Sequence, residues 1–206
     1  MLKRIFITTV LLSTIQLLFG QQIISVDNEV YTAIINSEII KTTASVTIIN
    51  ALLQNDKEPG DWVTQAIQSQ DPQQLETLRF STRDDKGNNV RSIDTATQHE
   101  VLRFYKSQTT GSALHGQIDV GIKVFMIARS PFKKNPKAEW KKFYKKYPGS
   151  GGLFQFSNIS YAEDGQTAVC YHSHYRNGLN AHGALAILTK INGAWLIKYH
   201  IDFWLA

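Results

Sequence analysis

The last third of the chain constrains the fold most, because its pattern is that of four strands joined by turns. Apolar and polar residues alternate with the period of two that half-buried strands require, over 153–161, 167–175, 183–191 and 194–205. Asn192-Gly193 separates the last two segments, and this pair accepts the positive φ angles of a tight hairpin turn. The polar loop 162–166, which contains a glycine, separates the first two segments. The pattern therefore predicts an antiparallel four-strand meander.

The Asn192-Gly193 turn also predicts which side chains share a face of this sheet. It sets Leu188 opposite Ile197 and Ala186 opposite Tyr199, and side chains alternate between the faces. The face expected to lie against the helices collects Phe154, Phe156, Asn158, Ala168, Cys170, His172, His174, Ala184, Ala186, Leu188, Trp195, Ile197, Tyr199, Ile201 and Phe203. The other face is expected to carry Gln155, Ser157, Tyr171, Ser173, Thr189, Lys198, His200 and Asp202.

The preceding segments predict helices and two further strands. An apolar stripe at helical spacing, starting at Asp27, predicts a long helix that reaches about Gln54. The other expected elements are helices at 62–70, 97–107 and 136–147 and strands at 75–82 and 117–128. The helix from Thr97 has Glu100 three residues later, the spacing of a capping box.

These elements predict one α+β domain with N-terminal helices packed on a mainly antiparallel sheet. A cone-like arrangement similar to the nuclear transport factor or cystatin folds is expected, and such a likeness implies no function.

The helix at 136–147 allows two interpretations. Trp140, Phe143, Tyr144 and Tyr147 follow the spacing of one apolar face, and lysines occupy much of the remainder. The helix could present a basic, aromatic-rimmed surface to an anionic polymer or lipid headgroups. We favour a docking helix with a solvated lysine face, because the aromatic residues stand where a core contact needs them. Without Lys3 and Arg4, which lie in the N-terminal segment, the net charge of +5 falls to +3, and this mild charge implies no nucleic-acid partner.

The N-terminus has the layout of a secretory signal peptide. Basic Lys3 and Arg4 precede an apolar run over 5–19, and small Gly20 precedes the expected cleavage site. The run is too short and too interrupted for a membrane span, so none is expected in the mature chain. We therefore expect a signal peptide at 1–20, a single domain at 21–206, and export to the periplasm or the outside of the cell. Cys170 is the one cysteine, so no intramolecular disulfide can form.

Three histidines form the clearest candidate for chemistry. His172 and His174 are predicted to point inward from one strand beside small alanines, and His182 lies in the loop before the next strand. Three imidazoles can hold a metal such as zinc, although such a site usually has a carboxylate as well. No carboxylate is near these histidines in sequence: the nearest acidic pair, Glu163 and Asp164, lies at the opposite end of the hairpin. The alternative is that these histidines are buried, neutral and hydrogen-bonded.

The leading hypothesis is a non-enzymatic exported protein that binds a small ligand or partner at the inner sheet face. The residues expected to line that site are His172, His174, Tyr199 and Arg176. One alternative is a metal-dependent hydrolase that uses His172, His174 and His182, and another is a purely structural envelope protein. No catalytic residue and no cofactor other than this zinc are predicted. Cys170 is expected to be a buried small hydrophobe rather than a nucleophile.

From 143 onward the chain resembles a group of small secreted proteins of Bacteroidetes-type bacteria to which no activity is assigned. The residues that carry the resemblance are Tyr147-Pro148, Gly152-Leu153, Ser157, Ile159, Tyr161, Ala168-Val169, Tyr171, Gly178-Leu179, Gly183, Leu188, Lys190, Trp195, Ile197 and Trp204. The resemblance covers about the last third of the chain. It implies export and a shared sheet.

Overall fold

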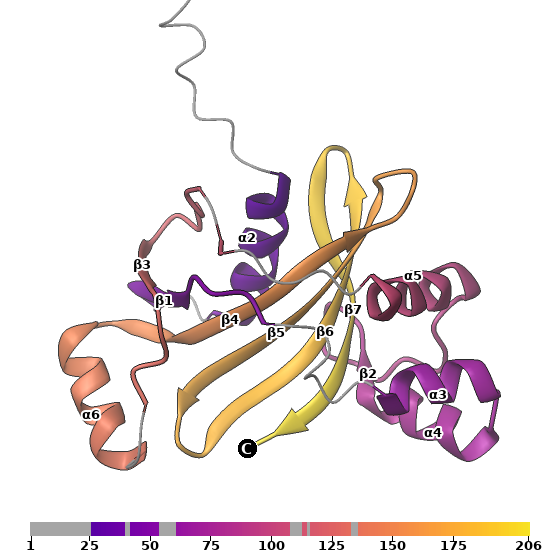
Figure 1. The fold of residues 1–206 in the computed structure, drawn as a ribbon, viewed down its shortest axis with the longest axis horizontal. Helices are drawn as coiled ribbons and strands as arrows, with labels where there is room; N and C mark the ends of the chain where they lie inside the picture. Colours follow the sequence, from indigo (N-terminus) through magenta and orange to yellow (C-terminus); the bar gives the residue numbers. More distant parts are fainter. Residues whose placement is uncertain (1–25, 40–41, 54–60, 108–112, 115, 133–135) are drawn as a thin grey trace, which may run out of the picture.

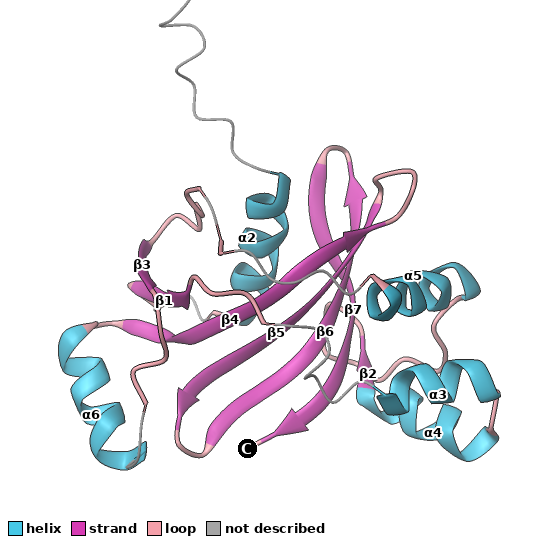
Figure 2. Ribbon diagram, viewed as in Figure 1, coloured by secondary structure: helices cyan, strands magenta, loops and turns pink. Residues whose placement is uncertain are grey.

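A seven-stranded mixed sheet forms the centre of the fold, with five helices around it in the part of the chain that the structure describes (Figures 1 and 2). The structure is a computed structural model that describes residues 26–39, 42–53, 61–107, 113–114, 116–132 and 136–206. The strand order is β2-β7-β6-β5-β4-β1-β3. The expected signal peptide at 1–20 lies outside the described residues, and so does its cleavage site.

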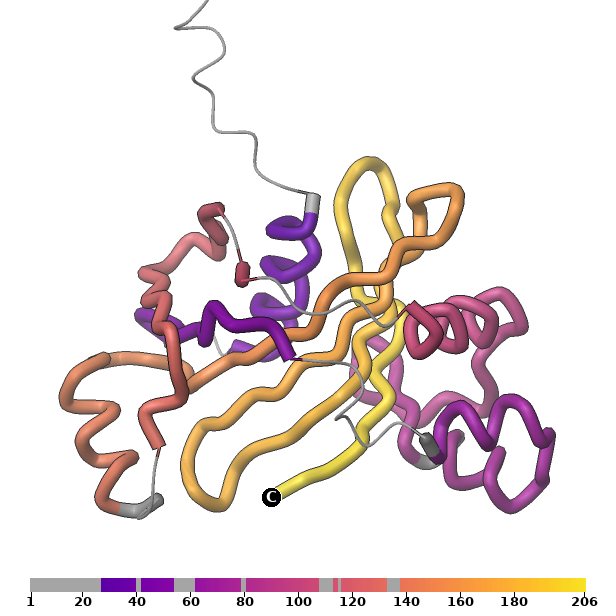
Figure 3. The backbone as a smooth tube through the Cα atoms, in the orientation of Figure 1, coloured from indigo at the N-terminus to yellow at the C-terminus, as the bar shows by residue number. Residues whose placement is uncertain are grey.

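The C-terminal strands form the predicted meander, which confirms the α+β fold class. The strands are β4 (Ser150–Tyr161), β5 (Thr167–Asn177), β6 (Asn180–Ile191) and β7 (Ala194–Leu205), each antiparallel to the next. Figure 3 follows the chain through the three hairpins. Asn192 and Gly193 have φ angles of 51° and 84°, as the predicted turn requires. His182 lies on β6 and not in the preceding loop, because the strand begins earlier than expected.

The long helix expected from Asp27 to Gln54 is wrong in its second half. Helix α2 (Val26–Glu38) ends early, and the chain returns as strand β1 (Ser45–Ile49), which is parallel to both β3 (Lys123–Ile127) and β4. Every residue of β1 is buried. A central strand buried on both faces has no polar alternation, so its apolar run can be mistaken for part of a helix.

The remaining elements agree with the sequence in part. Helices α3 (Asp61–Ser69) and α6 (Pro136–Lys146) lie where they were predicted. Helix α5 spans Thr95–Lys106, but its N-cap is Asp94 and not Thr97. The strand predicted at 75–82 is wrong, because this segment belongs to helix α4 (Pro72–Ser81) and only Thr82–Arg83 pairs as strand β2. The strand predicted at 117–128 shortens to β3.

Helices cover both faces of the sheet. Helix α2 packs on one face through Val30, Tyr31, Ile34 and Ile35, which join a core cluster with Phe154, Phe156, Cys170, Ala186 and Leu188. On the opposite face, α3, α4 and α5 contribute Val63, Ala66, Leu78, Val101 and Phe104 to a second cluster with Tyr171, Leu185 and Ile201. Both faces therefore exclude water over the centre of the meander.

Helix α6 covers the end of the sheet near β1 and β3 (Figure 1). Trp140, Phe143 and Tyr147 are buried in a third core cluster, whereas Lys141 and Lys145 are exposed. The aromatic residues make the core contact expected of a docking helix. No helix in the described ranges is both long enough and apolar enough to cross a membrane.

β-Bulges in β7 and β4 change the predicted faces of the meander. Leu188 pairs with Ile197 as predicted, but Ala186 pairs with His200 and not with Tyr199. The extra residue moves Tyr199, Ile201 and Phe203 to the face of the second cluster, and it brings His200 and Asp202 to the face under α2. A bulge in β4 similarly sets Ile159, rather than Asn158, opposite Cys170.

Candidate functional site

Glu38, the last residue of α2, lies among imidazoles on the sheet face under that helix. It follows Ile34 by four residues and Ile35 by three, so the helix turns its side chain toward the sheet. Only 14% of the side chain is exposed. A carboxylate is unfavourable at a helix C-terminus, where the helix dipole is negative, and the last turn of α2 contains no basic residue. Groups outside the helix must therefore compensate this charge.

The histidines come from three neighbouring strands. His172 and His174 lie two residues apart on β5, and His182 on β6 pairs directly with His174. His200 on β7 lies opposite Ala186, and its ring centroid is 5.6 Å from that of His172. Because the strands are adjacent and the side chains share a face, all four imidazoles gather beneath the end of α2.

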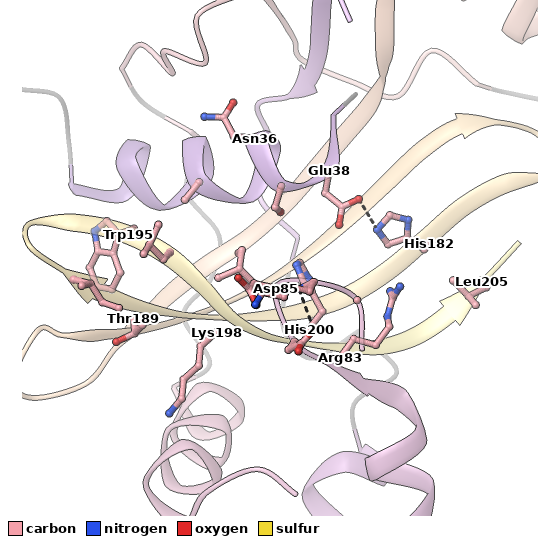
Figure 4. Close-up of a pocket in the computed structure, with 18 of the residues that line it drawn as sticks. Asn36, Glu38, Arg83, Asp85, His182, Thr189, Trp195, Lys198, His200 and Leu205 are labelled. Carbon is pink, nitrogen blue, oxygen red and sulfur yellow. Dashed lines mark hydrogen bonds and ion pairs between the residues drawn. The ribbon is translucent and has the colours of Figure 1, made fainter. Parts of the chain in front are cut away.

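Three of these imidazoles contact the Glu38 carboxylate. Oε2 of Glu38 lies 3.2 Å from Nε2 of His182 and 3.5 Å from Nδ1 of His174. The other oxygen, Oε1, lies 3.4 Å from Nε2 of His172. Figure 4 shows the Glu38 and His182 side chains facing each other across the gap between α2 and β6. Each carboxylate oxygen thus has its own imidazole neighbours.

Hydrogen bonding defines the tautomer of His174. Its Nε2 lies 2.9 Å from the carbonyl oxygen of Gly151, which can only accept, so Nε2 carries a hydrogen. Phe154 stacks on the ring at a centroid distance of 3.9 Å and holds its orientation. His174 is 1% exposed, and burial lowers its pKa although Glu38 and Gly151 act in the opposite sense. The neutral ring has a bare Nδ1, and this nitrogen faces Glu38.

Arg176 supplies the nearest permanent positive charge. Its guanidinium donates a 2.7 Å hydrogen bond to the backbone carbonyl of Glu38 and lies 3.9 Å from Oε2. Burial of Glu38 favours the neutral acid, but the contacts with His172, His174 and His182 outweigh burial and hold its pKa well below the usual range. Glu38 is therefore an ionised carboxylate near neutral pH.

Two sets of side chains in the described residues bring potential metal ligands within 4.8 Å of one another. They are Glu38 with His174 and His182, and Glu38 with His172 and His200. Neither set contains a thiolate. Glu38 is common to both.

A pocket of about 1020 Å³ opens beside this cluster, between α2 and the β6–β7 hairpin (Figure 4). One end is polar and is lined by Glu38, Arg83, Arg176, His182 and His200. The other end contains Trp195 with Thr189 and Lys198 (Figure 4), and Ala33, Ile191, Leu196 and Ile197 add apolar surface to the lining. The loop that carries Asp84, Asp85, Lys86 and Gly87 closes part of the wall.

The structure brings together most of the residues predicted for the site. His172, His174 and His182 lie within one cluster, and Arg176 lines the adjacent pocket. Tyr199 lies on the opposite face because of the β7 bulge, so its predicted place beside the histidines is wrong. The use of His172, His174 and His182 by a metal-dependent hydrolase stays a prediction.

Sequence reasoning missed Glu38 and His200. Glu38 is 134 residues from His172, and its only local signal is its spacing from Ile34 and Ile35 on the apolar stripe. His200 was assigned to the wrong face because nothing in the sequence of β7 indicates a bulge.

Cys170 lies on the same sheet face as the histidines, under α2, but its thiol is unreactive. It is fully buried, and its sulfur contacts Ser157. Burial raises the pKa of its thiol to about 12, so almost no thiolate forms near neutral pH. This agrees with its predicted role as a small hydrophobe.

No family model matches the chain, and it has no detectable match among curated proteins or solved structures. The resemblance to small secreted bacterial proteins and the likeness to nuclear transport factor or cystatin folds therefore stay predictions.

Proposed function

We propose that this protein is a non-enzymatic exported binding protein whose ligand is a small amphipathic molecule, held in the pocket between α2 and the β6–β7 hairpin. The observation that carries the proposal is that charged and imidazole groups and large apolar side chains line the same pocket. Its volume of about 1020 Å³ is at the upper end of the range of small-molecule sites. Export is proposed from the basic and apolar N-terminal segment alone.

The two ends of the pocket favour different parts of a ligand. His182 and His200 offer imidazole nitrogens to a polar head group, and Arg83 and Arg176 border the same end. Ile197 and Trp195 offer apolar surface to a hydrocarbon or aromatic body. Burial of that body contributes about 25 cal/mol per Å² of apolar surface, and the polar head fixes its orientation.

The test uses anilinonaphthalene sulfonate, a fluorescent amphipathic probe, and its displacement by decanoate. Ala33 lines the pocket and is half-buried on α2, so Ala33→Phe fills space that the ligand needs. We expect the purified protein to bind the probe, decanoate to displace it, and Ala33→Phe to weaken probe binding by about tenfold or more.

The matched control is Ala96→Phe, because Ala96 is exposed on α5 and does not line this pocket. It should leave probe binding unchanged. Probe binding that is equally strong in the wild type and in Ala33→Phe, with both variants folded by circular dichroism, would contradict the proposal.

A further inference from the structure

We propose that Glu38, His174 and His182 bind a divalent transition-metal ion of the Zn²⁺ type through Oε2, Nδ1 and Nε2 respectively. This site shares Glu38 and His182 with the lining of the amphipathic-ligand pocket, but binding of an ion does not require an amphipathic ligand. Its ligands come from the C-terminal end of α2 and from the neighbouring strands β5 and β6.

The distances from Oε2 of Glu38 to the two imidazole nitrogens are compatible with a bound ion, and all three ligand atoms lie within 4.8 Å of one another. Two ligands of a tetrahedral zinc ion, each about 2.0–2.2 Å from the metal, are roughly 3.3–3.5 Å apart. Oε2 of Glu38 is 3.2 Å from His182 and 3.5 Å from His174. A charge-assisted N–H···O bond would be shorter, at about 2.7–2.9 Å.

The hydrogen bond of His174 with Gly151 determines which ring nitrogen is available to an ion. Because Nε2 contacts the Gly151 carbonyl oxygen at 2.9 Å, Nδ1 is the nitrogen that faces Oε2 of Glu38, at 3.5 Å. Nδ1 is buried and has no hydrogen-bond partner among the described residues. An ion placed between Nδ1 and Oε2 would be coordinated by both atoms.

The surroundings of the site resemble those of protein metal centres. A ligand histidine commonly donates its other ring N–H to a carbonyl oxygen, and Gly151 accepts such a bond here. His172 holds the second carboxylate oxygen, Oε1, at 3.4 Å. It would orient Glu38 as a single-oxygen ligand and act as a positioning residue.

The donor set also indicates the class of ion. Two imidazoles and one carboxylate, with no thiolate, suit Zn²⁺, Co²⁺ or Fe²⁺ better than Ca²⁺ or Mg²⁺. Three protein ligands leave at least one coordination position free. Glu38 and His182 line the pocket, so an ion could enter from that side.

The experiment titrates the purified chain, first stripped with a chelator, with Co²⁺ and follows the visible absorption of tetrahedral cobalt. We expect one bound ion per chain, displaced by Zn²⁺. Glu38→Gln and His182→Ala should each weaken Co²⁺ binding by more than about 100-fold, because loss of a direct ligand exceeds the 10–100-fold effect of outer partners. His99→Ala is the control, since His99 is exposed on α5.

A second variant keeps the test valid if a substitution disturbs folding. His182→Cys supplies a thiolate at the same position, and it should bind Co²⁺ with a new sulfur-to-cobalt charge-transfer band in the near ultraviolet. No cobalt spectrum in the folded wild-type protein would overturn the inference. So would a loss of binding in His200→Ala together with full binding in His182→Ala, because the ion would then occupy the set that contains His172 and His200. Probe binding in the pocket is measured separately, so the two proposals can fail independently.

Discussion

At the scale of single residues, Gly152 allows β4 to approach the His174 ring. Its φ angle is +122°, a region that residues with a side chain rarely adopt. A Cβ atom at this position would lie 2.9 Å from Nε2 of His174 and closer still to the carbonyl oxygen of Tyr175. The absence of a side chain therefore allows the neighbouring Gly151 carbonyl to accept the His174 hydrogen bond.

Gly152→Ala should destabilise the protein strongly. We expect a cost of about 1–2 kcal/mol for the unfavourable backbone and about 1–3 kcal/mol more for the steric overlap. Gly165→Ala is the matched control, because Gly165 has a φ angle of +64° and no atom within 4 Å of its added Cβ. It should show the backbone cost alone. Urea denaturation followed by circular dichroism measures both, and equal costs would contradict this account of Gly152.

At the scale of secondary-structure elements, Asp94 joins the start of α5 to strand β7. Its carboxylate accepts hydrogen bonds from the backbone N–H of Thr97 at 2.9 Å and from Nζ of Lys198 at 2.7 Å. The first bond caps the helix, and Lys198 lies in the bulged part of β7. The capping box predicted at Thr97 is therefore wrong: Asp94, three residues earlier, caps the helix.

The charge of Asp94 should make stability depend on pH. Partial burial opposes ionisation, but the bonds from Lys198 and Thr97 outweigh it and lower the pKa of Asp94 to about 2. A depressed pKa adds stability that is fully present above the unfolded value of about 3.9 and is lost as the pH falls toward 2. Asp94 is 46% exposed, so solvent screening limits the effect to about 0.5–1 kcal/mol.

Asp94→Asn isolates this contribution, because Asn caps helices about as well as Asp but carries no charge. We expect the wild type to be more stable than the variant at pH 6, and the difference to disappear between about pH 4 and pH 2. Urea unfolding at a series of pH values measures it. A difference that stays constant or grows on acidification would show that the charge has no such role.

The secondary-structure elements differ in how well they could be predicted from the sequence. The meander was predictable because alternation and the Asn192-Gly193 turn are local signals that agree with each other. Strand β1 was not, because a strand buried on both faces loses its alternation and depends on partners far away in the chain. The β7 bulge was equally impossible to predict from local sequence. Because of it, His200 lies at the site where Tyr199 was expected. Three of the four histidines could therefore be found from sequence, whereas His200 and the Glu38 carboxylate could not.

At the scale of the whole molecule, Cys170 reports on global unfolding. It lies on β5, the middle strand of the seven, and it is fully buried. No local movement of a surface loop exposes a residue in such a position, so its thiol becomes reactive when the sheet itself opens.

The labelling rate of Cys170 by Ellman's reagent should therefore follow the free energy of unfolding. We expect almost no reaction in the native protein and a rise in rate with urea that parallels the denaturation curve. Leu179→Cys provides the contrast, because Leu179 is 88% exposed in the turn between β5 and β6. In that variant, the thiol introduced at position 179 should react at once, which gives one labelled thiol per chain. Rapid labelling of native Cys170 would show that the sheet opens locally.

The separation of Glu38 from the histidines has a consequence for the order of folding. Strands β4 to β7 form hairpins between neighbours in sequence, which close quickly, whereas α2 must return across 134 residues to reach His172. The imidazoles are therefore expected to assemble before their carboxylate arrives. An ion that requires Glu38 would then bind only after the rate-limiting step of folding. It would stabilise the native state without stabilising the transition state. It would therefore slow unfolding and leave the folding rate almost unchanged.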